Sequence, residues 1–120
     1  MSRPRVLCLH DDVDILDYVV ACLAGELEVI AMTRVRDALG TLRTVGADGV
    51  VTAVLLGREG SGLAFAVEAM HLGVAAHRIV ILTGWLGGGL PDPLRAAALL
   101  KMPVPYEELL AILRERLPLG

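Results

Sequence analysis

The stretch Arg5-Val-Leu-Cys-Leu-His-Asp-Asp12 joins a short apolar run to three polar residues that stop it. The next apolar positions follow the spacing i, i+3, i+4 and i+7, which is typical of one helix face: Leu16, Val19, Val20 and Leu23. Asp12 or Asp14 is expected to cap this helix, and Gly25 to end it. A strand followed at once by a helix is the repeating unit of parallel α/β folds.

The same alternation continues along the chain. Apolar runs at residues 27–32, 49–56 and 78–83, and a brief one at 99–100, predict four more strands. Further helices are expected to begin at Thr33 or Asp37, after Ser61, and at Pro105 and Tyr106. Glycines and prolines between residues 84 and 93 exclude a long helix there. We therefore expect one domain, residues 1–120, with a flavodoxin-like, doubly wound, five-stranded parallel sheet whose fourth helix is short or replaced by a glycine-rich loop.

Composition excludes several classes of protein. The chain of 120 residues is 55% hydrophobic, which is too apolar for a disordered protein. Its net charge of −3 and 3% aromatic content argue against nucleic-acid binding. No apolar stretch approaches the roughly 20 residues of a membrane span, and the N-terminal run is too short for a signal peptide. Two cysteines do not make a disulfide framework, so we expect a reduced, cytoplasmic protein.

Residues that follow the predicted strands form the candidate site, because ligands of open parallel sheets bind beyond the carboxyl ends of the strands. The first strand is followed by acids, the fourth ends in a hydroxyl, and the fifth ends in an amine. An acidic cluster, a hydroxyl and a lysine suit a hard cation and a phosphoryl group. The candidates are His10, Asp11, Asp12, Ala53, Thr83 and Lys101.

Three stretches of the sequence, in their order along the chain, resemble motifs of the response-regulator receiver domains of the CheY-like family. The resemblance rests on residues 5–12, on Ile79-Val-Ile-Leu-Thr83, and on Lys101 with Pro103 and the helix that follows. It implies a receiver-like domain in two-component signal transduction and phosphorelay. In that family an aspartate ending the third strand accepts a phosphoryl group, acids after the first strand help to hold Mg²⁺, and the Ser/Thr and Lys contact the phosphoryl oxygens.

The phosphoacceptor position falls on Ala53, which has no oxygen to attack phosphorus. The resemblance therefore implies a degenerate pseudo-receiver with a vestigial pocket of His10, Asp11, Asp12, Thr83 and Lys101. With His10 in place of one acid, we expect weak Mg²⁺ binding at Asp11 and Asp12, or none, and no other cofactor. Lys101 is free to pair with Asp11. Compared with the family's lysine-proline turn, Met102 is an extra residue between Lys101 and Pro103, and it is expected to disfavour the cis bond that usually follows the lysine.

The leading hypothesis is a phosphorylation-independent protein-interaction module that is not an enzyme. Trp85, Leu86 and Leu90, beside the edge strand at residues 99–101, are the expected interaction face for a signalling partner or a second copy of the chain. The alternative is a small-molecule or anion-binding domain that uses the Asp11 and Lys101 edge or the glycine-rich loop. Residues 57–62 lack the Lys-Ser/Thr of a phosphate loop. An enzyme ranks last, because no nucleophile has an adjacent base.

Overall fold

The computed structural model describes residues 3–84 and 89–118. Five parallel strands form one sheet in the order β2-β1-β3-β4-β5. The strands are β1 (Arg5–Leu9), β2 (Glu28–Met32), β3 (Gly49–Ala53), β4 (Ile79–Thr83) and β5 (Ala98–Lys101). This is the expected doubly wound topology, with β2 and β5 at the two edges of the sheet.

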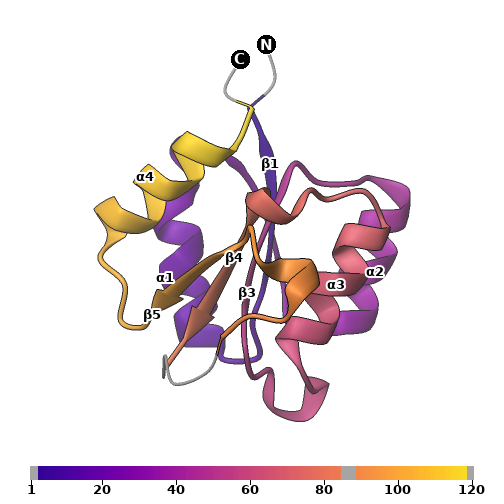
Figure 1. Ribbon diagram of the computed structural model, residues 1–120. Coiled ribbons are helices and arrows are strands. Elements are labelled where there is room, and N and C mark those ends of the chain that lie inside the picture. The colour runs from indigo at the N-terminus through magenta and orange to yellow at the C-terminus, as the bar shows by residue number, and fades with distance from the viewer. Residues whose placement is uncertain (1–2, 85–88, 119–120) are drawn as a thin grey trace.

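In the described part of the chain, four α-helices cover the two faces of the sheet. They are α1 (Val13–Leu23), α2 (Val35–Thr44), α3 (Gly62–His71) and α4 (Tyr106–Arg116). Helices α1 and α4 lie on one face, and α2 and α3 lie on the other (Figure 1). Each face has its own buried aliphatic cluster, centred on Leu23 and Leu109 beneath α1 and α4 and on Leu7 and Ile81 beneath α2 and α3. No helix in the described part of the chain has the length and apolar character that a membrane span requires.

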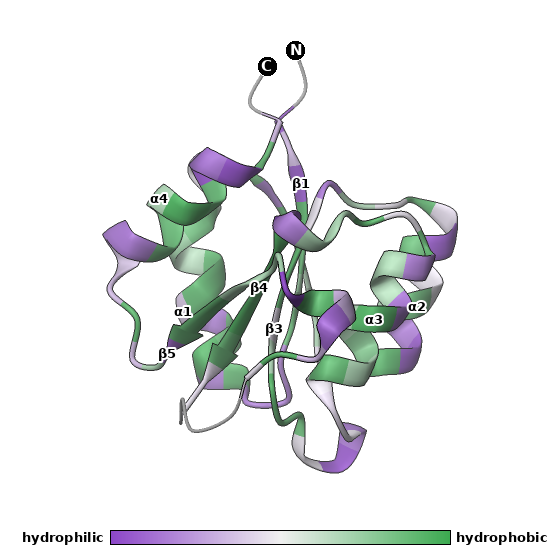
Figure 2. Cartoon of the chain, in the orientation of Figure 1, coloured by the Kyte–Doolittle hydropathy of each residue, from purple (hydrophilic) through white to green (hydrophobic). Residues whose placement is uncertain are grey.

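Burial explains the apolar character of the central strands. Every residue of β3 and β4 is buried, as expected for parallel strands with helices on both faces. In Figure 2 the ribbon of β4 is hydrophobic along its length, and hydrophilic residues interrupt the outer parts of the helices. The predicted strand at residues 49–56 is shorter in the structure, because the chain leaves the sheet after Ala53 and turns through the 3-10 helix Gly57–Glu59.

The connection from β4 to β5 holds no α-helix in the residues described, which are Gly84 and residues 89–97. Its one regular element there is the 3-10 helix Asp92–Leu94, which buries Leu94 completely. This agrees with the expectation of a short or replaced fourth helix. In the described part of this connection, a 3-10 helix therefore stands in place of an α-helix between β4 and β5.

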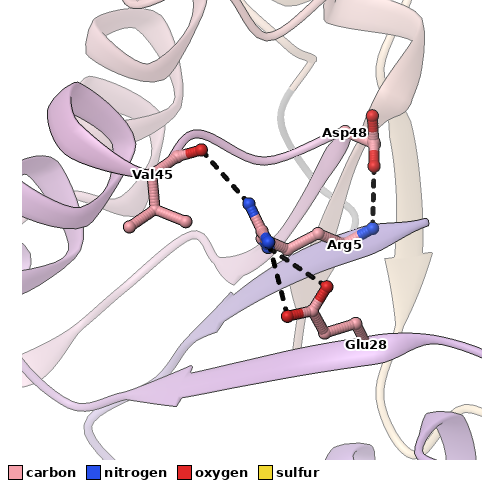
Figure 3. Close-up of polar contacts among 4 residues, drawn as sticks. All are labelled: Arg5, Glu28, Val45 and Asp48. Carbon is pink, nitrogen blue, oxygen red and sulfur yellow. Dashed lines mark hydrogen bonds and ion pairs between the residues drawn. The ribbon is translucent and has the colours of Figure 1, made fainter. Parts of the chain in front are cut away.

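The amino-terminal edge of the sheet is closed by polar contacts around Arg5 (Figure 3). The backbone N–H of Arg5 donates to Asp48 at 2.8 Å, and its guanidinium donates to the carbonyl of Val45 at 3.2 Å. The guanidinium also lies 3.3 Å from the carboxylate of Glu28. These contacts tie β1, β2 and the start of β3 together at the edge opposite the candidate site.

Candidate functional site

The parallel topology brings the predicted residues to one edge of the sheet. His10 directly follows β1, and Ala53, Thr83 and Lys101 are the last residues of β3, β4 and β5. The backbone N–H of His10 donates to the carbonyl of Met32, which fixes the end of β1 beside β2. The predicted location of the site at the carboxyl ends of the strands is thus what the fold provides.

The three residues after β1 hold one another in a tight turn. The Asp12 side chain caps α1, accepting hydrogen bonds from the N–H groups of Asp14 at 2.9 Å and Ile15 at 3.2 Å. The Asp12 N–H donates to Nδ1 of His10 at 3.0 Å. Because this nitrogen accepts a hydrogen bond, the proton of the neutral imidazole is on Nε2.

The carboxylate of Asp11 is turned away from Lys101. Its Oδ1 lies 3.4 Å from Nδ1 of His10, and its Oδ2 occupies the space where a side chain at Gly57 would stand. Gly57 also has a φ of +59°, so both the nearby carboxylate and the backbone conformation favour glycine at this position. Asp11 borders a separate surface hollow together with Arg34, Arg36 and Arg58. The expected ion pair between Asp11 and Lys101 is absent from the described residues.

Met102, rather than Lys101, faces the site. Lys101 is exposed at the end of the edge strand β5, whereas the half-buried Met102 lines the pocket. The Met102 N–H donates to the carbonyl of Thr83 at 2.7 Å, so the chain runs beside the end of β4 for one residue beyond Lys101. The bond between Met102 and Pro103 is cis, which the tertiary amide before a proline makes accessible. The bond that directly follows Lys101 is not cis, in agreement with the expectation for Met102.

A largely apolar pocket of about 570 Å³ occupies the edge where a phosphoryl site was anticipated. Ala53 and Thr83 both border it, and His10 contributes its imidazole. The remaining lining is mostly aliphatic: Ile15, Val54, Leu55, Leu63, Leu82, Gly84, Gly89, Leu90, Leu99 and Met102. Thr52 is not among the lining residues, and its buried hydroxyl lies near Gly62 at the start of α3.

The residues at this edge do not fit a magnesium site. In the described parts of the chain, no three His, Cys, Asp or Glu side chains come together in a group that could hold a metal ion. Asp12 is engaged as a helix cap, Asp11 rests against Gly57, and Ala53 offers no oxygen from its side chain. Mg²⁺ is usually held by one or two carboxylates together with waters or phosphates. Of Asp11 and Asp12, the two predicted ligands, Asp11 alone has a carboxylate that does not cap α1, and that carboxylate lies against Gly57 and His10.

The predicted interaction face is only partly within the described chain. Trp85 and Leu86 lie outside the described residues. Leu90 is half-buried, packs against the cluster beneath α2 and α3, and lines the pocket. Leu90 is therefore a wall of the pocket as much as a surface residue.

Sequence reasoning did not identify Met102, Leu63 or Leu99 as site residues. One signal for Met102 was present, because the chain has an extra residue between Lys101 and Pro103. That residue occupies the position next to the proline turn. Leu63 and Leu99 carried no comparable signal, since both read simply as core positions of a helix and a strand.

No protein-family model and no curated protein matches the sequence. Solved structures match the fold. Chemotaxis protein CheY4 from Vibrio cholerae has a TM-score of 0.84 at 21% identity, covering 97% of this chain and 100% of that one. A CheY-like receiver domain protein from Methanospirillum hungatei JF-1 has a TM-score of 0.82 at 22% identity, covering 95% and 93%.

A third structure shows the same fold in a modified state. It is a response regulator from Burkholderia pseudomallei with a phosphorylated aspartic acid, a calcium ion and citrate. Its TM-score is 0.77 at 21% identity, over 92% of this chain and 66% of that one. The chain thus has the fold of CheY-like receiver domains, and its site differs from the one that the family resemblance implies.

Proposed function

We propose that this chain is a receiver-like domain of two-component signal transduction that works without phosphoryl transfer, as a module that binds another protein. The fold supports the class, because receiver structures cover nearly the whole chain. The observation that carries the proposal is Ala53, which ends β3 at the carboxyl edge and is buried against aliphatic neighbours. A site built around Ala53 has no carboxylate to accept a phosphoryl group.

The surroundings of Ala53 support the same proposal. A phosphorylated aspartate with a bound cation needs converging acids and a cation near the phosphoryl oxygens. Here Asp11 is directed towards Gly57 and the arginines of the neighbouring hollow, and Lys101 lies outside the pocket. We also propose that the domain is not an enzyme, since the buried Thr52 hydroxyl has no base beside it in the described chain.

The outer edge of β5 is the surface that we assign to the partner. This strand is at the end of the sheet order, so its outer backbone groups have no neighbouring strand within the described sheet. Exposed strand edges are templates for pairing with a strand of another chain. Such a partner presents an extended segment, and a second copy of this chain can supply one.

Phosphoryl acceptance is tested directly by intact mass. The chain is incubated with acetyl phosphate and Mg²⁺, with the Burkholderia response regulator as the positive control, because its structure contains a phosphorylated aspartic acid. We expect no adduct on this chain. A stoichiometric, acid-labile phosphoryl adduct would overturn the proposal.

Partner binding is tested by affinity capture from an extract of the source cells. Lys101→Glu reverses the charge at the exposed end of β5, and Arg43→Glu makes the same change on exposed α2. We expect Lys101→Glu to weaken capture of the partner and Arg43→Glu to leave it intact. Sedimentation velocity identifies the case in which the partner is a second copy. Equal capture by all three proteins would contradict the assignment to β5.

A further inference from the structure

The pocket at the carboxyl edge has the size and the lining of a small-molecule site. We propose that it takes a small, uncharged and largely apolar molecule that carries one hydrogen-bond acceptor. The pocket volume of about 570 Å³ is within the range of roughly 300–1,000 Å³ that small-molecule sites occupy. This inference goes beyond the proposed function and does not depend on it, because a ligand can bind here whether or not a protein binds at β5.

The pocket exists because two features of the chain coincide. The connection between β4 and β5 supplies a short 3-10 helix, in its described part, where a full helix would pack against the sheet. Leu63 from α3, Leu90 from the connection and Leu99 from β5 then border the space that is left. Ala53, at the end of β3, also borders this space, and its side chain is a single methyl group that leaves much of the space unfilled.

The lining excludes a charged ligand. Among the described residues that line the pocket, His10 is the one with an ionisable side chain. Lys101 is not among its lining residues, and the arginines of the neighbouring hollow line that hollow together with Asp11 and Glu59. A phosphate or carboxylate would lose its hydration here without gaining a paired charge, which is strongly unfavourable.

His10 supplies the polar contact. Its Nδ1 is occupied by the N–H of Asp12, so the neutral ring carries its proton on Nε2, and no group in the described chain bonds to that nitrogen. A ring that lines the pocket with one free N–H suits a single carbonyl or ether oxygen of a ligand. Apolar contact provides the affinity, and this hydrogen bond orients the molecule.

The probes are two neutral dyes and one anion. 6-Propionyl-2-dimethylaminonaphthalene is an uncharged naphthyl ketone, N-phenyl-1-naphthylamine lacks the carbonyl, and 1-anilinonaphthalene-8-sulfonate carries a charge. We expect saturable binding of the ketone to the full chain by fluorescence, with the sulfonate at least about tenfold weaker. Failure of the ketone to bind, or equal affinity for the sulfonate, would overturn the proposal.

Two variants place the probe in the pocket. Ala53→Leu fills part of the space and should weaken ketone binding about tenfold or more, while Ala31→Leu, on the exposed part of the opposite edge strand β2, should not change it. Leu63→Phe is a second variant that fills the pocket. Its ketone affinity, which should also fall, is the test if circular dichroism shows that Ala53→Leu does not fold. Ketone affinity unchanged in a folded filling variant would locate the probe elsewhere and refute the site.

The hydrogen bond is tested by His10→Phe, which keeps an aromatic ring and removes the donor. We expect it to weaken binding of the ketone several-fold and to leave N-phenyl-1-naphthylamine nearly unaffected. An equal loss for both dyes would contradict the role given to His10. None of these readouts involves a protein partner or a phosphoryl donor, so failure here is distinguishable from failure of the proposed function.

Discussion

The backbone carbonyl of Ala53 lies in the space that a side chain at Gly62 would occupy. The first residue of α3 therefore packs directly against the end of β3, and its N–H donates to the carbonyl of Val54 at 2.8 Å. This contact sets the position of α3, and with it the position of Leu63, relative to Ala53. Gly62 thus fixes the position of Leu63 in the pocket wall, although Gly62 itself does not line the pocket.

Gly62→Ala should destabilise the fold by about 1–3 kcal/mol, because the new methyl group must displace either α3 or the end of β3. The free energy of unfolding in urea is the measurement. Gly25→Ala is the matched control, since a side chain there meets nothing within 4 Å, and it should be neutral within about 0.5 kcal/mol. Equal stability of the two variants would contradict the close contact.

Asp11 and Lys101 should be energetically independent. The carboxylate of Asp11 faces Gly57 and His10, and Lys101 is exposed at the end of β5. A double-mutant cycle with Asp11→Asn and Lys101→Met should therefore give a coupling free energy within about 0.3–0.5 kcal/mol of zero. Thermal unfolding of the four proteins provides the cycle. A coupling above about 1 kcal/mol would indicate the ion pair that the structure lacks.

The strands were predictable because the sequence marks them strongly. The fully buried β3 and β4 are continuous apolar runs, and a parallel sheet with helices on both faces requires such runs. The cap of α1 was predicted to be Asp12 or Asp14, because an aspartate before a helical apolar pattern can accept the first N–H groups, and the structure selects Asp12.

The site was less predictable, because it depends on which way single residues face. Lys101 matched a family motif, yet the extra residue before Pro103 leaves Lys101 outside and Met102 inside the pocket. A shift of one residue at a strand end exchanges the two faces of the sheet. The pocket itself has no sequence signature, since its volume comes from the spacing between α3, β5 and the short connection before β5.

Cys8 should be inert in the folded protein. Complete burial raises the pKa of its thiol from 9.0 to about 12, and the thiolate is the reactive form. Iodoacetamide at neutral pH should label Cys8 only after denaturation, whereas the half-buried Cys22 serves as the internal comparison. Peptide mass mapping distinguishes the two, and modification of Cys8 under native conditions at the rate of Cys22 would contradict its burial.

The same thiol makes stability depend on pH. Between about pH 9 and 12 the unfolded chain loses the Cys8 proton while the folded chain keeps it, so the folded state binds more protons and stability falls as pH rises. The slope from this group approaches about 1.4 kcal/mol per pH unit. The stability difference between wild type and Cys8→Ala, measured by urea unfolding, should shrink across this window. A constant difference would contradict the shifted pKa.

Ala53→Asp should destabilise the protein by about 2–4 kcal/mol at neutral pH, because it places a carboxylate among aliphatic side chains. Burial favours the protonated form, so the folded-state pKa of the introduced carboxyl should exceed its unfolded value of about 3.9. The penalty should therefore be small below about pH 4 and should grow as pH rises through that value, since the unfolded chain then loses its proton first.

Adding Met102→Lys to Ala53→Asp puts a cation on the wall of the same pocket and should recover on the order of 1 kcal/mol. Ala64→Asp, exposed in the first turn of α3, is the control and should be neutral or slightly stabilising. Urea unfolding at several pH values provides all of these quantities. A penalty for Ala53→Asp as small as that of the control, at neutral pH, would mean that water or a cation reaches the end of β3, and the apolar description of the pocket would be wrong.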